Sequence, residues 1–122
     1  MSFNVNVTSD FAKAVKRLNK RYPSFKKDYA EFLASIKQNP LQGVELYPGI
    51  RKIRLQIKSK GKGKSGGARV ITFNVLVDNT SGDVYLLLLY DKEDASSVDV
   101  KVVKDLIHEM GLDGNNPSET NK

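Results

Sequence analysis

The chain has 122 residues, a formal net charge of +6, 39% hydrophobic residues and no cysteine. This length suits one domain with a single core, and the lack of cysteine excludes disulfide bonds and thiolate metal sites. An excess of basic residues favours a polyanion such as nucleic acid as partner. Because no apolar run resembles a signal peptide or a membrane span, we expect a soluble, cytoplasmic protein that does not bind a membrane.

The N-terminal part of the chain predicts one short strand and two helices. Residues 3–7 alternate apolar with polar side chains, as a strand does. Residues 8–10 can cap a first helix, and Pro23 with Ser24 can open a second one that ends at Asn39-Pro40. Each helix has one apolar stripe, so the two predict a helical hairpin packed on a sheet. The stripes contain Phe11, Ala14, Val15 and Leu18, then Phe25, Tyr29, Phe32, Leu33 and Ile36.

The segment from residue 41 to residue 69 predicts a loop, a strand and a second loop. Glycine and proline punctuate residues 41–49, which we interpret as a loop. Residues 52–58 alternate apolar with basic or polar side chains, which predicts a strand with one buried and one charged face. In residues 60–67 lysine alternates with glycine or serine, which predicts a basic loop. This surface is suited to a negative partner, although an edge strand protected by lysines against aggregation also shows such a pattern.

The C-terminal part predicts two more strands and a helix. Residues 69–77 are rich in β-branched side chains, and residues 78–83 have the composition of a hairpin turn. Residues 84–90 are apolar on both faces, which predicts a central strand covered on each side. Ser96 and Asp99 resemble a capping box that opens the last helix.

Together these elements predict a single α+β domain over residues 1–112. We expect a small antiparallel β-sheet, with the N-terminal helical hairpin on one face and a C-terminal helix that stops at Gly111. Residues 113–122 have nothing to bury, so we expect a disordered tail.

Most familiar catalytic constellations are missing from the sequence. There is one histidine, His108, and the acidic residues are scattered, so we expect neither a metal site nor a cofactor. One reaction needs only bases and cations, namely cleavage of RNA by its own 2′-hydroxyl group. Clustered cations can stabilise the phosphorane, and a lysine whose pKa is lowered by neighbouring cations can accept the proton. The same cluster would also serve a passive RNA clamp.

Three motifs resemble the RelE/ParE superfamily of bacterial toxins. They are Lys52-Ile53-Arg54-Leu55, the basic glycine-rich loop that leads into Arg69-Val70-Ile71, and the run from Tyr85 to Lys92. The loop 60–69 and the ending from Tyr90 to Asp94 look most like the HigB-type branch. The resemblance extends from about Phe11 to Met110 and implies a RelE-like fold. It also implies a toxin that cuts mRNA on the ribosome without a metal and is held inactive by a cognate antitoxin.

Matched residue by residue, the resemblance implies a set of catalytic side chains. Only Lys52 is suited to accept a proton, since arginine scarcely loses one, and Arg69 would brace the phosphorane. Some family members carry a tyrosine a few residues beyond the last basic position, where this chain has Val98 and Asp99. Tyr90 is a candidate substitute, although a tyrosine that ends a strand is commonly a half-buried sheet residue. The implied catalytic set is Lys52, Arg54, Arg69, Tyr90 and Lys92, and the implied contacts to RNA backbone are Lys58, Lys60, Lys62 and Lys64.

Two alternatives remain open at this point. ParE-type members of the superfamily share the fold but inhibit DNA gyrase, and they tend to lack the basic catalytic set. A non-catalytic RNA-binding relative would keep the charge and lose the cleavage.

Overall fold

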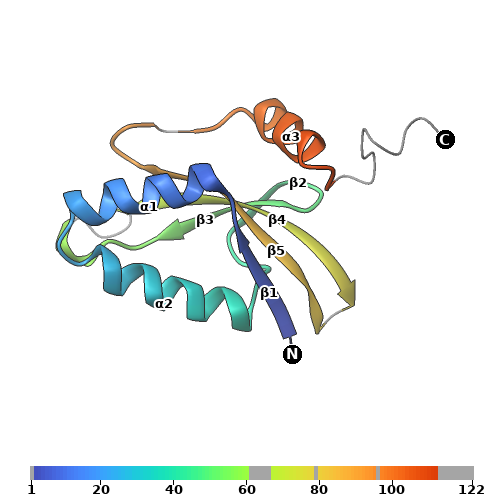
Figure 1. The fold of residues 1–122 in the computed structure, drawn as a ribbon, viewed down its shortest axis with the longest axis horizontal. Coiled ribbons are helices and arrows are strands. Elements are labelled where there is room, and N and C mark those ends of the chain that lie inside the picture. Colours follow the sequence, from blue (N-terminus) through green and yellow to red (C-terminus); the bar gives the residue numbers. More distant parts are fainter. Residues whose placement is uncertain (1, 61–66, 79, 96, 113–122) are drawn as a thin grey trace.

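The computed structural model describes residues 2–60, 67–78, 80–95 and 97–112. Figure 1 shows a twisted sheet with α1 and α2 on one face and α3 on the other. None of the helices in these ranges is long and apolar enough to cross a bilayer. The elements are β1 (Ser2–Val7), α1 (Ser9–Arg21), α2 (Phe25–Gln38), β2 (Val44–Tyr47), β3 (Ile50–Leu55), the 3₁₀-helix η1 (Lys58–Lys60), β4 (Ala68–Asp78), β5 (Ser81–Asp91) and α3 (Val100–Glu109).

The sheet has five strands in the order β1-β5-β4-β3-β2. Strands β3, β4 and β5 form the predicted antiparallel meander. The predicted α+β fold is confirmed, but the sheet is mixed and not purely antiparallel, because β1 pairs in parallel with β5. A parallel neighbour needs a crossover connection, and the long segment between these two strands supplies it.

The predicted loop over residues 41–49 is wrong in part, because it contains β2. This strand forms a hairpin with β3, in which Val44 faces Lys52 and Tyr47 faces Ile50. Gly43 and Gly49 have φ angles of 76° and 85°, a backbone conformation that glycine adopts without strain. The side chains of β2 are mostly exposed, so this strand lacks the burial pattern by which a sequence reveals a strand.

Two apolar cores lie on the two faces of the sheet. Under the α1–α2 hairpin, Ile53 and Leu55 of β3 pack with helix residues such as Leu18. On the opposite face, Ile50 and Leu87 pack with α3. Because β5 contributes to both cores, the prediction of a central strand covered on each side is confirmed. Lys52 and Arg54, which alternate with Ile53 and Leu55, therefore lie on the face of α3.

The helix ends follow side-chain chemistry. Thr8 caps α1, since its hydroxyl oxygen accepts a hydrogen bond from the Phe11 amide at 3.1 Å. The last helix begins later than predicted, because Asp99 is itself the N-cap and accepts from the Lys101 amide at 2.9 Å. Ser96, the other half of the predicted capping box, lies outside the described residues, as do residues 113–122. Gly111 follows α3 with a φ angle of 72°, as expected for a helix stop.

Candidate functional site

Three of the predicted catalytic residues form one row across the sheet. Arg54 of β3 lies directly opposite Arg69 of β4, which lies directly opposite Tyr90 of β5. Directly opposed residues project from the same face of a sheet, with Cβ atoms about 4.5–5.5 Å apart. Lys52 precedes Arg54 by two residues and therefore projects from this face as well. The sheet register thus brings together residues that are separated by up to 38 positions in the chain.

The row has two guanidinium groups at its centre. Arg54 is exposed, whereas Arg69 is half-buried and donates a hydrogen bond from Nη1 to the Ala68 carbonyl oxygen at 3.2 Å. Like charges that face each other across strands destabilise a sheet. Such a pair is most stable when an anion lies between or above the two groups, so the row is suited to a phosphate.

Tyr90 closes the row with a buried hydroxyl group. Burial raises the pKa of the Tyr90 phenol, while the positive charge of Arg69 acts in the opposite direction. The phenol therefore keeps its proton at neutral pH and is a hydrogen-bond donor. Within the described part of the chain, its oxygen is buried and has no hydrogen-bond partner.

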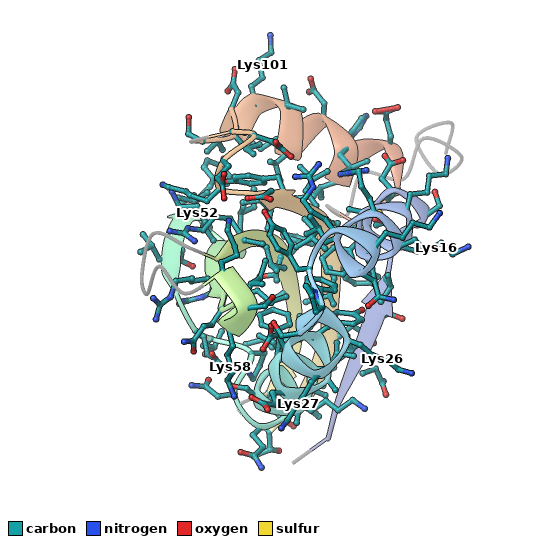
Figure 2. All side chains as sticks on the ribbon, turned by 90° about the vertical axis from the view of Figure 1, so that its left-hand side faces the viewer. Lys16, Lys26, Lys27, Lys52, Lys58 and Lys101 are labelled. Carbon is teal, nitrogen blue, oxygen red and sulfur yellow. The ribbon has the colours of Figure 1, made fainter. Side chains whose placement is uncertain are left out.

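The remaining predicted residues lie around this row. The Lys58 ammonium group is half-exposed and lies 3.2 Å from Glu31. Figure 2 shows Lys52 and Lys58 on the same side of the molecule, away from Lys16 and Lys26. Lys92 follows β5 directly, and its amide donates to the Gly67 carbonyl oxygen at 3.3 Å. Lys62 and Lys64 lie outside the described residues.

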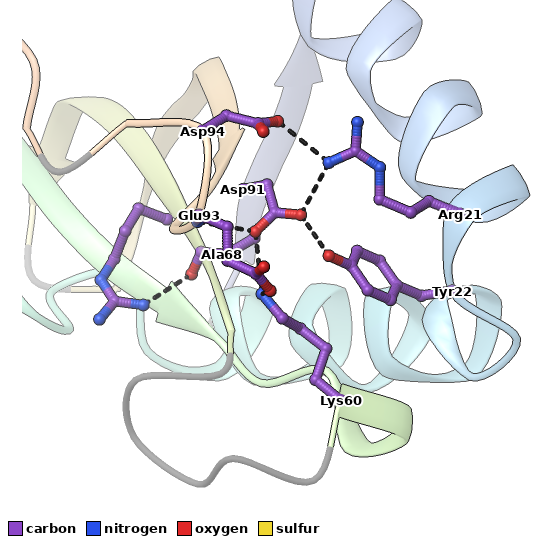
Figure 3. Close-up of polar contacts among 8 residues, drawn as sticks. Arg21, Tyr22, Lys60, Ala68, Asp91, Glu93 and Asp94 are labelled. Carbon is purple, nitrogen blue, oxygen red and sulfur yellow. Dashed lines mark hydrogen bonds and ion pairs between the residues drawn. The ribbon is translucent and has the colours of Figure 1, made fainter.

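Lys60 has a different environment from the one expected of an RNA contact. Its side chain is only 2% exposed, and its Nζ lies 2.8 Å from Asp91 Oδ1 and 3.0 Å from Glu93 Oε2 (Figure 3). The same ammonium group lies 5.2 Å from the centre of the Tyr22 ring. Because these partners enclose it, Lys60 does not enter the RNA-contacting surface that we propose below.

Asp91 is the residue around which these contacts gather, and sequence reasoning missed it. Besides Lys60, its carboxylate accepts from Arg21 Nη1 at 2.9 Å and from the Tyr22 hydroxyl group (Figure 3). Arg21 also binds Asp94 at 3.0 Å. One signal was present in the sequence, because an acidic residue that ends a strand buried on both faces requires partners.

The pKa of Asp91 reflects two opposing effects. Burial alone would raise it, but the hydrogen bonds from Lys60, Tyr22, the Glu93 amide and Arg21 outweigh burial and hold the pKa well below its usual range. For Lys60, burial acts to lower the pKa, and the bonds to Asp91 and Glu93 raise it overall. Both groups are therefore charged at neutral pH, and the pair is a true buried ion pair.

A second buried carboxylate fixes η1 against α2. Asp28 accepts from Ser24 Oγ at 2.5 Å and from the Lys58 amide at 3.1 Å. Beside it lies a cavity of about 250 Å³, whose lining includes Arg54 and Gln56. In the described ranges, no three His, Cys, Asp or Glu side chains gather in a way that could hold a metal ion.

No protein-family model matches the chain. Among solved structures, the fold is similar to that of the E. coli toxin RelE, determined as a double arginine-to-alanine mutant in the free state. The similarity has a TM-score of 0.52 and 14% sequence identity, and it covers 79% of this chain and 90% of RelE. This chain has a RelE-like fold. The predicted architecture is thereby confirmed, and the closer likeness to the HigB-type branch stays a prediction.

Proposed function

We propose that this protein is the toxin of a type II toxin–antitoxin pair and that it cleaves mRNA on the ribosome, in the cytoplasm, without a metal ion. The observation that carries the proposal is the row Arg54–Arg69–Tyr90, with Lys52 on the same face of a RelE-like sheet. The row combines two permanent cations with a protonated phenol, and together these suit a phosphodiester whose charge increases during the reaction.

In the proposed reaction, the Lys52 amine accepts the proton of the 2′-hydroxyl group of the RNA. The O2′–P bond forms and the P–O5′ bond breaks, which leaves a 2′,3′-cyclic phosphate and a 5′-hydroxyl end. Arg54 and Arg69 stabilise the phosphorane oxygens. The Tyr90 oxygen is buried in the free protein, so its phenol donates a hydrogen bond to one of them only once RNA binding exposes it. Lys92, directly after β5, is positioned to protonate the leaving 5′-oxygen, and half-exposed Lys58 contacts the RNA backbone.

The same row suggests how a cognate antitoxin would act. Two neighbouring guanidinium groups and Lys52 attract an acidic segment as well as they attract a phosphate. An antitoxin that presents carboxylates to these cations would relieve their repulsion and exclude RNA. We therefore propose that the antitoxin covers this face of the sheet.

Mapping the 5′ ends of message in a translating ribosome extract tests the proposed cleavage. We expect codon-spaced cuts, and a loss of roughly 10²-fold or more in cleavage rate for Lys52→Ala and for Arg69→Ala. Lys26→Ala is the matched control, because it removes one exposed lysine on the other side of the molecule (Figure 2). Thermal unfolding of each variant shows whether the sheet is retained.

Two other outcomes would overturn the proposal. Trapping of DNA gyrase on DNA, without cuts in the message, would identify a ParE-like inhibitor. RNA binding without cuts would identify a non-catalytic relative.

A further inference from the structure

The buried ion-pair network joins three segments that are far apart in the sequence. Arg21 and Tyr22 come from the end of α1, Lys60 from the end of η1, and Asp91 with Glu93 from the end of β5. We call these five residues the Asp91 clasp. The Asp91 side chain is fully buried, so its carboxylate depends on the clasp for all of its stabilisation.

The clasp lies next to the proposed catalytic residues on both sides. Asp91 separates Tyr90 from Lys92 in the chain, and its Oδ1 also accepts from the Glu93 amide at 3.0 Å. Its backbone carbonyl oxygen accepts from the Ala95 amide at 3.2 Å, which turns the chain immediately after β5. The position of Lys92 is therefore set by the contacts of Asp91.

The clasp also fixes η1 relative to β5, at the strand end where β4 pairs. Ala68 lies directly opposite Asp91 in the sheet, one residue before Arg69, and the Gly67 carbonyl oxygen accepts from the Lys92 amide. Lys60 ends η1, the helix that carries Lys58. The Asp91 carboxylate thus connects the end of β5, next to Tyr90, to the helix that carries Lys58, and backbone pairing joins β4 with Arg69 to the same strand end.

Stability alone does not explain a buried ion pair of this kind. Apolar side chains of similar volume are commonly as stabilising as a buried ion pair, because both charges lose their hydration. What the charged groups add is directional contact, since each oxygen of Asp91 is held by defined donors. This combination is suited to holding a neighbouring site in one geometry.

We propose that Lys60 and Asp91 are positioning residues for RNA cleavage, and that Lys60 acts through the clasp and not by contact with RNA. This inference rests on the proposed function, because the expected fall in kcat requires that the protein cleaves RNA. It concerns residues that touch neither the RNA nor the reacting atoms. Their task is to hold Tyr90 and Lys92 in register with Arg69.

Binding and turnover of the Lys60→Met variant separate positioning from RNA contact. We expect kcat to fall by about 10²-fold, the cost of a displacement of about 1 Å in an active site. RNA affinity should be unchanged, because the amides of Lys58 and Ser59 still donate to Asp28 and Ser24 and keep Lys58 in place. The slope of log affinity against log salt concentration should also stay at the wild-type value. Lys58→Met should instead weaken binding and reduce the magnitude of that slope by about 0.7, because one phosphate contact is lost. Lys60→Arg keeps the charge and should restore part of the turnover.

Hydrogen exchange of individual amides tests the clasp without any activity. In Lys60→Met, the Lys92 and Glu93 amides should exchange faster than in the wild type. The Asn39 and Asn74 amides, which donate to Ser35 and Gly49 at 2.9 Å in other parts of the fold, should keep their protection. Lys58→Met is the matched control, since the pair it breaks is exposed.

The possible results lead to distinct conclusions. A reduced salt slope in Lys60→Met, or unchanged exchange at Lys92 and Glu93, would overturn the positioning role. If the wild type does not cleave RNA, the proposed function fails, and the exchange and binding measurements still decide whether the clasp holds the end of β5.

Discussion

Asp91 and Asp94 show how strongly burial changes the contribution of one ion pair to the stability of the fold. Both carboxylates bind Nη1 of Arg21, at 2.9 and 3.0 Å. The side chain of Asp91 is 0% exposed and that of Asp94 is 53% exposed. Solvent screens an exposed ion pair, whereas a buried charge that loses its partner is left without hydration.

Replacing each aspartate by asparagine should therefore give unequal losses of stability. Asp91→Asn leaves the buried Lys60 ammonium group without its nearest counter-charge, and we expect a loss of about 3–5 kcal/mol in the free energy of unfolding. Asp94→Asn is the matched control and should give a much smaller loss. Urea unfolding monitored by circular dichroism measures both, and equal losses would show that the clasp carries no special stability.

The environment of the Lys60 side chain is a feature of a single residue that the sequence does not predict. Lysines at positions 58, 60, 62 and 64 look equivalent in the sequence, and the family resemblance implies contact with RNA backbone for all four. The structure separates Lys58, which is half-exposed, from Lys60, which is enclosed by Asp91 and Glu93. The alternation of residue types cannot show this, because the partners of Lys60 lie 31 and 33 positions further along the chain.

The elements themselves were easier to predict where one face is buried. Ile53, Leu55 and Ile57 alternate with polar residues, and all three are in the core under the helical hairpin. This alternation also placed Lys52 and Arg54 together on the other face. The parallel pairing of β1 was not predictable in this way, because alternation identifies a strand but not its neighbour.

The first helix depends on a single threonine that also contacts the sheet. The Thr8 hydroxyl group accepts from the Phe11 amide and donates to the Leu87 carbonyl oxygen at 2.9 Å. We expect Thr8→Ala to lower the free energy of unfolding by about 1–2 kcal/mol, because the cap is lost and a carbonyl group of β5 loses its donor. Thr8→Ser keeps the hydroxyl group and should lose much less. Thermal unfolding of the two variants compares them, and equal losses would mean that the methyl group matters and the hydroxyl group does not.

Across the whole molecule, the excess of positive charge makes acid conditions unfavourable. The chain carries a formal net charge of +6 at pH 7, and protonation of carboxylates at low pH adds to the repulsion. Asp91 adds a specific contribution, because its pKa is depressed in the folded state. The unfolded chain binds the proton first, near a pKa of about 3.9, so this stability is present above about pH 5 and is lost as the pH falls below about 4.

The dependence of stability on pH should therefore change when Asp91 is removed. Between about pH 5 and pH 2, we expect the free energy of unfolding of the wild type to fall more steeply than that of Asp91→Asn. Urea midpoints measured across this range give the two slopes. Parallel curves would contradict the depressed pKa of Asp91.

The position of β5 between the first strand and β4 also affects when the protein completes its fold during its own synthesis. β5 pairs with β1 on one side and β4 on the other, although β1 is the first strand of the chain and β5 the last. The pairing with β1 needs residues 81–86, and the pairing with β4 is complete only with residue 91, so neither forms until this last strand has left the exit tunnel of the ribosome. Only then can Tyr90 pair with Arg69 across the sheet, and only then can Lys60 form its ion pair with Asp91. If the protein cleaves message as we propose, it becomes able to do so only after most of its own chain has been synthesised.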